Sequence, residues 1–481
     1  MTAARPIVVA SNRGPVTFVR HDDGAVEAKR GVGGLVTAVG GAVRGHDATW
    51  ISAAISEEDR RRAGPGAPPH ELPAAGGSIH VRMLAPDLDD YDSFYNQISN
   101  RILWFLHHYL WDAAGTPDFG DEHEAWWQSF RAVNDAFAAG VAEALPADGI
   151  ALPQDYHLSL VPGALRRHGA NAPIAFFWHI PFCQPDQFRL LPDRWGTELL
   201  RESLVADVVG FHSPRWARNF LECCAAVLGA RVHRRVVHFE GRRTAVRAYP
   251  IGVDVDTLAR ASESAEVDAA LAALDRVVGD RLLVLRADRT ELTKNILRGL
   301  SAFGRLLERR PDLRDRVVHV ARLSPSRAGV PEYEEYMERC KQQAGAVNER
   351  FGSETWTPIV MDVDNDFVKT LAAYRRYDVL IVNPVYDGMN LVAREGPLVN
   401  ERDGVLVLSR NAGAADELGS AALLVNPFDV TGTVDALEQA IDMAAGERRA
   451  RAEQLRPLAA GTHPARWIEA QIRDAQKMRG A

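Results

Sequence analysis

Short apolar runs alternate with longer amphipathic segments along the whole chain. One set of runs occupies the N-terminal half and a second set occupies the C-terminal half. In order they are PIVVAS, ATWISAAI, SIHVRML, GIALPQ, PIAFFWHI and DVVGFHS, and then RLLVLRAD, RVVHVARL, TPIVMDV, DVLIVNP, GVLVLS and AALLVNP. Short apolar runs separated by helix-length segments are typical of strands in a mostly parallel sheet covered by helices. The repeated pattern therefore predicts an α/β protein with two Rossmann-like domains.

The boundary between the two domains is predicted near residue 250, where a hairpin turn at FEGRRT is followed by the linker YPIGVD. We assign residues 1–250 to an N-terminal domain and residues 251–463 to a C-terminal domain. The last segment, about 464–481, has the pattern of an amphipathic helix. The segment 60–78 is rich in Pro, Gly and Ala and is predicted to be a surface loop.

Length and charge narrow the functional class. A chain of 481 residues exceeds what one hydrophobic core usually supports, which agrees with two domains. The 56 Lys and Arg residues against 64 Asp and Glu residues give a net charge of −8, which argues against general attraction to nucleic acid or to an acidic membrane surface. An anionic substrate must then be held by local basic clusters.

The cysteines and the apolar segments indicate the compartment. The four cysteines show no metal-ligand spacing, and the adjacent Cys223 and Cys224 are expected to pack within a helix. The N-terminus lacks the pattern of a signal peptide, and no window reaches about 18 uninterrupted apolar residues. We predict a reduced, cytoplasmic protein with no membrane segment.

A glycine-rich stretch, KRGVGGLVTAVGGAV, precedes a helical pattern in the first domain. The backbone at Gly31, Gly33 and Gly34 could approach a phosphate or a sugar closely. No apolar strand runs directly into this stretch, and the Lys and Ser/Thr of a Walker motif are absent. An ordinary tight turn and a ligand-binding loop both remain open.

Polar side chains follow two of the predicted strands in the first domain. Asp155 and His157 lie in PQDYHLSLVP, and His179 lies in FFWHIPF. At one edge of a sheet these groups could hydrogen-bond the hydroxyls of a sugar, which need donors and acceptors at fixed positions. The alternatives are buried histidines with a purely structural role, and glycoside hydrolysis by the carboxylates of Asp155 and Glu395.

Two segments of the second domain carry charged residues, and the first of them suggests a site for an anion. In LRADRTELTKNI, Arg289 and Lys294 flank a strand-to-helix turn, where they could clamp a departing diphosphate or could simply be solvated. The acidic DVDND at 362–366 is expected to cap a loop, and we assign no metal to it.

The stretch NPVYDGMNLVARE, residues 383–395, follows another predicted strand. Asp387 and Gly388 suit a turn, and a helix is expected to start after Gly388. In open α/β sheets, ligands bind beyond the carboxyl ends of the strands, where helix N-termini favour anions. The stretch is therefore a second candidate for the site, and an ordinary turn is the alternative.

Taken in order, these motifs make the chain resemble the trehalose-6-phosphate synthase family of retaining glycosyltransferases, family 20. The resemblance runs from SNRGP at 11–15 to WIEAQI near the end. The matching motifs are SNR, GGL, YDSFYNQISNRILW, QDYHLSLVP, FFWHIPF, YPIGVD, RTELTK, SPSR, WTP, YDGMNLVARE and VLSRNAGAADEL.

The resemblance implies a fold and an activity. The fold would be two Rossmann-like domains facing a cleft, the architecture called GT-B, with a C-terminal helix that crosses back to the N-terminal domain. The activity would be transfer of glucose, with retention, from a nucleoside diphosphate glucose to glucose 6-phosphate, giving α,α-trehalose 6-phosphate. No metal or other cofactor is implied. Retention without an enzymic nucleophile implies front-face attack, with the leaving phosphate as the base.

The resemblance also implies roles for single residues. The implied catalytic residues are Asp155, His179, Arg289, Lys294 and Asp387. The implied donor-binding residues are Gly33, Gly34, Arg289, Lys294, Asp387, Gly388, Met389, Asn390, Leu391, Val392 and Glu395, the last at the ribose of the nucleotide. The implied acceptor-binding residues are Arg13, Tyr95, Trp104, Asp155 and Arg327.

Departures from the family pattern leave details open. Glu291 stands in RTELTK where the family usually has Asp, and Cys183 stands where proline is usual. The shape of the acceptor pocket and the choice between GDP-glucose and UDP-glucose are therefore undetermined, as is any homo-oligomeric state.

Two other functions are kept as alternatives. A pseudo-glycosyltransferase of similar fold would couple a nucleotide-linked cyclitol to an aminocyclitol phosphate in natural-product biosynthesis, and GPLVNERDG is shared with such relatives. A non-catalytic sugar-phosphate sensor would be expected to lose Arg289, Lys294 or Asp387, and all three are present.

Overall fold

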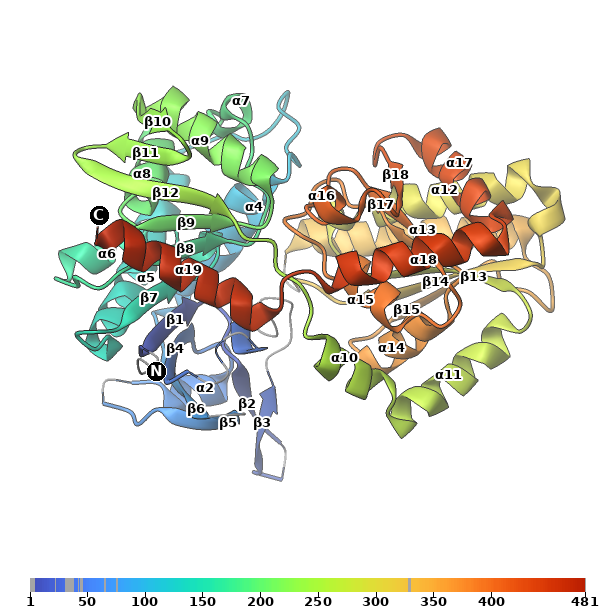
Figure 1. Ribbon diagram of the computed structural model, residues 1–481, viewed down its shortest axis with the longest axis horizontal. Helices are drawn as coiled ribbons and strands as arrows, with labels where there is room; N and C mark the ends of the chain where they lie inside the picture. The colour runs from blue at the N-terminus through green and yellow to red at the C-terminus, as the bar shows by residue number, and fades with distance from the viewer. Residues whose placement is uncertain are drawn as a thin grey trace. The chain divides into compact units, whose positions relative to one another are not determined.

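The computed structural model describes residues 5–21, 23–30, 39–41, 43, 46–64, 66–74, 77–327 and 330–480. The chain forms two compact units by its internal contacts. Unit 1 comprises Met1–Ile251 and His463–Ala481, and unit 2 comprises Gly252–Thr462. Each unit is an open sheet covered by helices (Figure 1), so the predicted class, α/β with two Rossmann-like domains, is confirmed.

The sheet of unit 1 is built mainly from parallel strands. Its two hydrogen-bonded parts have the orders β5-β6-β4-β1-β7 and β8-β9-β12-β11-β10, and two isolated parallel bridges, Ala151 to Ile174 and Gln154 to Phe177, connect them alongside β7 and β8. The parallel strands are β1 (Ile7–Ser11), β4 (Ala48–Ala53), β6 (Gly77–Leu84), β7 (Ile150–Pro153), β8 (Ala175–Trp178), β9 (Val208–Phe211) and β12 (Arg242–Ala248). The antiparallel strands are β5 (His70–Ala74), β10 (Arg231–His233) and β11 (Val236–Phe239), with a separate hairpin of β2 (Val16–Arg20) and β3 (Val26–Arg30).

The strand order of unit 1 locates a binding position. The chain builds the sheet outward from β1 through β4 and β6, and then returns to add β7 on the other side of β1. In open parallel sheets, ligands bind beyond the carboxyl ends of the strands at such a reversal. Arg13 follows β1 and Asp155 follows β7, so both lie at this point of the sheet.

The predicted surface loop at 60–78 is wrong in part. It includes the end of helix α2 (Glu57–Arg62) and strand β5, which pairs antiparallel with β6. Proline is tolerated at the edge of a sheet, and β5 is an edge strand. Pairing with β6 therefore decides a conformation that local composition does not favour.

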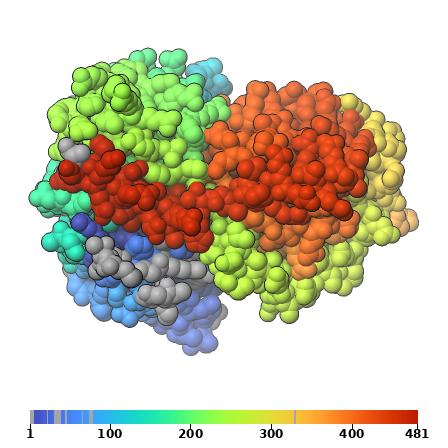
Figure 2. Space-filling model, viewed as in Figure 1, coloured from blue at the N-terminus to red at the C-terminus, as the bar shows by residue number. Residues whose placement is uncertain are grey.

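Helices cover both faces of the unit 1 sheet. The helices described within the first 251 residues include α2, α3 (Leu88–Asp92), a π-helix (Ser93–Leu103), α4 (Trp104–His107), α5 (Asp121–Ala144), α6 (Val161–Arg167), α7 (Pro185–Phe188), α8 (Asp193–Ser203) and α9 (Pro214–Leu228). The C-terminal helix α19 (Pro464–Arg479) returns to this unit and packs on β8, β9 and β12 (Figure 1). The indole of Trp467 donates to the Tyr249 carbonyl at 2.9 Å, while the outer side of α19 stays at the surface (Figure 2).

Unit 2 is a six-stranded parallel sheet with the order β15-β14-β13-β16-β17-β18. The strands are β13 (Leu282–Arg289), β14 (Val317–Ser324), β15 (Ile359–Val363), β16 (Val379–Val382), β17 (Val405–Ser409) and β18 (Leu423–Val425). The order reverses between β13 and β16, which pair directly. The loops that follow these two strands are the ones that carry Lys294 and Asp387, so both candidate segments meet at the position where such sheets bind ligands.

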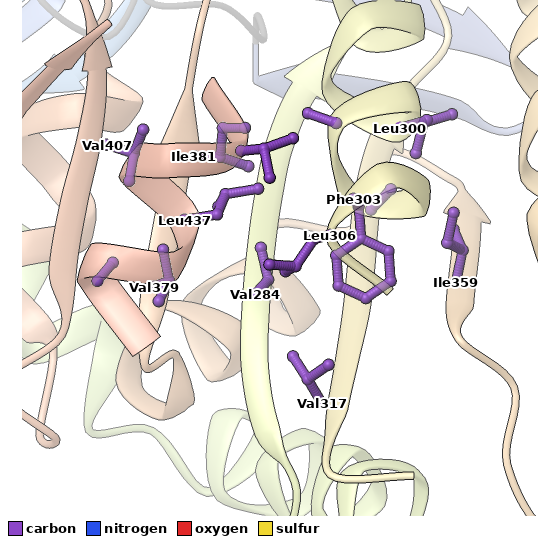
Figure 3. Packing of buried hydrophobic residues seen from close by; sticks show 14 of the residues in the cluster. Val284, Leu300, Phe303, Leu306, Val317, Ile359, Val379, Ile381, Val407 and Leu437 are labelled. Carbon is purple, nitrogen blue, oxygen red and sulfur yellow. The ribbon is translucent and has the colours of Figure 1, made fainter. Parts of the chain in front are cut away.

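The core of unit 2 holds this sheet against its helices. Apolar residues of β13, β14, β16 and β17 pack against α12 and α17, with Val284, Phe303 and Leu437 among the buried members (Figure 3). The helices are α10 (Val255–Ser262), α11 (Ala265–Val278), α12 (Ile296–Arg309), α13 (Pro331–Phe351), α14 (Phe367–Arg376), α15 (Val392–Val399), α16 (Ala415–Leu418), α17 (Val430–Asp442) and α18 (Ala445–Ala460).

Two further predictions concern membrane segments and the cysteines. Within the described ranges, no helix is long and apolar enough to cross a membrane. All four cysteines are free and buried, and Cys223 and Cys224 lie in α9, where they pack as the sequence suggested.

Candidate active site

An ion pair joins the two loops at the reversal of the unit 2 sheet. Lys294 Nζ lies 2.6 Å from Asp387 Oδ2, and both side chains are largely shielded from solvent. Burial alone would lower the pKa of Lys294, but Asp387, Asp288 and Glu291 outweigh it and raise that pKa. Lys294 is therefore a fixed positive charge beside a carboxylate, at a place suited to an anionic ligand.

The turn that contains Asp387 is shaped by Asn390. Asn390 has a φ of 78°, and its side chain donates to Asp387 Oδ2 at 3.1 Å and accepts from the Ala393 amide at 3.1 Å. A residue in this left-handed conformation cannot continue an α-helix. The helix α15 consequently starts at Val392, four residues later than Gly388, which corrects the sequence-based start.

A neighbouring loop, missed by the sequence reasoning, supports this turn. Gly413 donates its amide to the Asp387 carbonyl at 3.1 Å, and Asp387 donates its own amide to the Asn411 carbonyl at 3.2 Å. A Cβ atom on Gly413 would lie 2.0 Å from the Gly388 carbonyl oxygen, which no side chain can do without a shift of the backbone. The motif SRNAGAADEL contained this signal, because a glycine there permits close backbone approach.

A second group that the sequence reasoning missed lies beneath Lys294. The fully buried guanidinium of Arg286 donates to Asp288 at 2.7 Å, to the Lys294 carbonyl at 3.0 Å, and to Asn383. Burial raises the pKa of Asp288 to about 6, against the lowering effect of Arg286 and Lys294. This network fixes the backbone at Lys294 from below.

Arg289 does not join Lys294 in one clamp by direct contact. It is half-exposed, and its guanidinium lies 2.8 Å from the carboxylate of Glu291, which is fully buried. Burial would raise the pKa of Glu291, but Arg289, Arg327 and Lys294 together lower it to about 2. Glu291 is thus an ionised carboxylate that faces three basic groups.

The residues after the turn can offer a ligand their backbone and the carboxylate of Glu395. Met389 is buried, while Leu391, Val392 and Glu395 are partly exposed. Although part of Glu395 is exposed, the surrounding protein desolvates its carboxylate and raises the pKa of Glu395 to about 7. Glu395 therefore changes its charge near neutral pH, and the affinity of a ligand that hydrogen-bonds to its carboxylate would change with it.

In unit 1, the backbone of Asp155 adopts a conformation that is rare for residues other than glycine. Its φ is 74° and its ψ is 162°. Its amide donates to the Phe177 carbonyl at 2.7 Å, and its carboxylate accepts from the amides of Tyr156 at 3.0 Å and His179 at 3.2 Å. Strain of this kind clusters at functional sites, because the surrounding structure must hold it. The geometry therefore supports Asp155 as a site residue.

The structure places His179 next to Asp155 but engages both of its ring nitrogens. Nε2 lies 2.9 Å from Gln154 Oε1, and Nδ1 lies 3.1 Å from His212 Nε2. Burial, and then His212 and His157, hold the pKa of His179 well below its usual value, so the ring is neutral. Gln154 and His212 were not selected from the sequence, although His212 follows β9 as His179 follows β8.

Three of the predicted acceptor residues gather around the loop after β7. Arg13 donates to the Tyr95 hydroxyl at 3.4 Å, and the Tyr95 ring stacks on His157 at 5.8 Å. Trp104 lies 6.0 Å, centroid to centroid, from Tyr156.

The winding of the π-helix decides this arrangement. With roughly 4.4 residues per turn, as i-to-i+5 hydrogen bonding gives, nine residues make about two turns, so Tyr95 and Trp104 project to one side. An α-helix would have placed them on opposite sides. The sequence predicted a helix but not its type.

The remaining predicted residues are Arg327, Gly33 and Gly34. Arg327 belongs to unit 2, has a φ of 46°, and stacks its guanidinium on the ring of Tyr333 at 5.1 Å while donating to the Tyr333 hydroxyl. Gly33 and Gly34 lie outside the described residues, as does Gly31.

The acidic segment DVDND is engaged with basic side chains. Arg322 pairs with Asp362 and, at 2.6 Å, with Asp364, and Asp366 caps α14 by accepting from the Lys369 amide at 3.0 Å. In the described part of the chain, no three His, Cys, Asp or Glu residues are grouped so that they could hold a metal ion.

Comparison with known proteins gives a consistent family. The sequence model described as "Glycosyltransferase family 20" matches residues 5–477. The chain is 36% identical to the bifunctional trehalose-6-phosphate synthase/phosphatase of Thermoproteus tenax over 94% of its own length, and it spans 61% of that relative. It is 33% identical to the trehalose-6-phosphate synthase of Mycobacterium avium, with 96% of this chain and 93% of the relative covered. It is also 33% identical to the validamine 7-phosphate valienyltransferase of Streptomyces hygroscopicus, with 97% and 93% covered.

Solved structures agree with this result. An E. coli structure bound with UDP-2-fluoro glucose superposes with a TM-score of 0.85 at 27% identity, covering 98% of this chain and 99% of that one. A Burkholderia xenovorans α,α-trehalose-phosphate synthase (UDP-forming) in complex with glucose-6-phosphate gives a TM-score of 0.83 at 29% identity, with 98% and 100% covered.

Proposed function

Because the chain belongs to glycosyltransferase family 20, we propose that it transfers glucose with retention from a nucleoside diphosphate glucose to glucose 6-phosphate, giving α,α-trehalose 6-phosphate. The observation that carries the proposal is the ion pair of Lys294 and Asp387 at the reversal of the unit 2 sheet. A cation at this point suits a departing diphosphate, and a carboxylate suits the hydroxyls of the donor sugar.

The proposed donor carries uridine. The similar structures from Burkholderia are described as UDP-forming, and the E. coli structure holds a UDP-sugar analogue. GDP-glucose is kept as a comparison in the test below.

The proposed chemistry needs no enzymic nucleophile. Asp387 already accepts from Lys294 and Asn390, which lowers its nucleophilicity and leaves it as a hydrogen-bond acceptor for the sugar. The acceptor hydroxyl then attacks the donor sugar on the same face from which the diphosphate departs, and an oxygen of that diphosphate takes the hydroxyl proton. Arg289 and Lys294 counter the charge that develops on the diphosphate. No metal is required in this scheme.

A second candidate function has one observation in its favour. The valienyltransferase of Streptomyces hygroscopicus is as similar to this chain as the mycobacterial synthase, with equal identity and coverage of the relative. In that case the acceptor would be an aminocyclitol phosphate and the donor a nucleotide-linked cyclitol.

A panel of donors and acceptors tests the proposal. Purified protein is incubated with UDP-glucose, GDP-glucose or a nucleotide-linked cyclitol as the donor, and with glucose 6-phosphate, glucose or an aminocyclitol phosphate as the acceptor. Release of nucleoside diphosphate is followed together with the product mass. The expected result is a disaccharide phosphate formed fastest from UDP-glucose and glucose 6-phosphate. Faster turnover with the cyclitol pair would select the second candidate, and no transfer with any pair would contradict both.

A further inference from the structure

One buried carboxylate in unit 2 connects two loops that the proposed function uses separately. Glu291 lies in the loop after β13, between Arg289 and Lys294, and is 0% exposed. Its Oε1 atom forms an ion pair with Arg289 Nη1 at 2.8 Å and accepts a hydrogen bond from Ser326 Oγ at 2.9 Å. Ser326 precedes Arg327 in the loop after β14. A single oxygen atom therefore ties the donor-diphosphate loop to the loop of the acceptor phosphate.

Backbone contacts place the two loops in register around this carboxylate. The Thr290 amide donates to the Ser324 carbonyl at 2.8 Å, and the Ser326 amide donates to Thr290 Oγ1 at 3.2 Å. The Lys294 amide donates to the Glu291 carbonyl at 3.0 Å. Displacement of one loop would therefore be transmitted to the other through a short chain of hydrogen bonds.

The charges around Glu291 explain why this connection should affect phosphate binding. Arg289, Arg327 and Lys294 all act on this carboxylate, and Arg289 and Ser326 both bond to it. Hydrogen bonds that involve an ionised partner are roughly twice as strong as neutral ones. Phosphate that engages Arg289 must bind a group that this carboxylate holds, and phosphate that engages Arg327 binds next to Ser326, which donates to the same carboxylate.

We propose that Glu291 is a positioning residue that couples the donor-diphosphate site to the acceptor-phosphate site, so that occupation of either loop orders the other. Coupling between two sites is reciprocal, so UDP must strengthen glucose 6-phosphate binding by the same factor as the reverse. The inference rests on the proposed function, which places the donor diphosphate at Arg289 and Lys294, and on the acceptor-phosphate role that the family resemblance implies for Arg327.

The test measures the coupling factor by titration calorimetry. The dissociation constant of UDP is determined with and without saturating glucose 6-phosphate, in the unmodified protein and in Ser326→Ala and Glu291→Gln. The quantity compared is the ratio of the two UDP dissociation constants, without and with glucose 6-phosphate. The loss of a negative charge can change both constants, but a change of both by the same factor does not alter their ratio. We expect a ratio of at least about fivefold in the unmodified protein, within the usual range of such couplings. Both variants should reduce it toward one.

Ser326→Ala keeps the experiment decisive if Glu291→Gln folds poorly, because it removes one hydroxyl from a partly exposed position. Glu438→Gln is the matched control, since Glu438 also pairs with an arginine in unit 2, Arg309 at 3.1 Å, but lies in α17. Its coupling should equal that of the unmodified protein.

The outcomes separate this inference from the proposed function. If the unmodified protein transfers glucose but its ratio is one, the coupling role alone is overturned. The same holds if the unmodified protein is active and both variants keep its ratio. A loss of thermal stability in the variants with the ratio preserved would show a purely structural role and would also overturn it. Absence of transfer and of UDP binding in the unmodified protein would instead overturn the proposed function.

Discussion

The ammonium group of Lys294 and the carboxylate of Asp387 lie 2.6 Å apart, although 93 residues separate them along the chain. The contact exists because β13 and β16 are neighbours in the sheet, so that the loops after them meet. Each of these two residues limits the position of the other. The expected effects of changing the site follow from this relationship and from the groups packed behind it.

Lys294→Ala should lower the rate of transfer at saturating donor by at least about tenfold, because it removes a fixed positive charge from the departing diphosphate. Lys341→Ala is the control, since Lys341 is exposed on α13 and forms a surface ion pair with Glu338. Initial rates and circular dichroism of both variants make the comparison. An unchanged rate in a folded Lys294→Ala protein would remove Lys294 from the mechanism.

Gly413→Ala should weaken UDP binding and lower the free energy of unfolding by about 1–3 kcal/mol, the usual range for overpacking. The added Cβ would meet the Gly388 carbonyl at 2.0 Å and displace the turn that holds Asp387. Gly446→Ala in α18 meets no atom within 4 Å and should be neutral or slightly stabilising. Denaturant unfolding and calorimetry report both quantities. Equal behaviour of the two variants would show that close approach at Gly413 is unimportant.

Binding of UDP should strengthen as the pH rises from 6 to 8. With a pKa of about 7, Glu395 is ionised in about one tenth of the molecules at pH 6 and about nine tenths at pH 8, so a ligand that needs the carboxylate gains up to about tenfold in affinity. Glu395→Gln cannot titrate and supplies the reference for titration of the UDP phosphates. If the unmodified protein and the variant show the same pH dependence, Glu395 does not bind the ribose as a carboxylate.

Arg327→Ala should raise KM for glucose 6-phosphate and shrink the preference for it over glucose, while the affinity for UDP measured alone changes little. An arginine fork suits phosphate oxygens, and a net charge of −8 makes local attraction necessary. Arg339→Ala, at an exposed position of α13, is the control. Equal use of glucose and glucose 6-phosphate by the unmodified protein would contradict the assignment of this arginine.

Chelators should leave the rate of transfer unchanged. The acidic side chains of DVDND already pair with Arg322 and Lys369 or cap α14, which leaves them poorly placed to ligate a cation. Rates are compared before and after dialysis against a chelator, with a divalent ion added back. A loss that the ion restores would identify a metal requirement, and this segment would then be the first place to mutate.

The sequence by itself determined the strands, the family and the candidate loops. Apolar runs predict buried parallel strands because such strands are covered on both faces, and each run listed for unit 2 is a strand of its sheet. The positions of Lys294, Asp387 and Asp155 could be selected because polar residues directly follow those runs. Motif order then identified the family without knowledge of any contact.

Only the tertiary structure decided how these residues are held. The strand β5, the π-helical winding that aligns Tyr95 with Trp104, and the start of α15 at Val392 depend on partners that no local pattern contains. The same is true of the bond from Glu291 to Ser326, which joins residues 35 positions apart. Burial makes such bonds decisive, because a buried polar group must find a partner wherever the fold brings one, and sequence distance has no part in that choice.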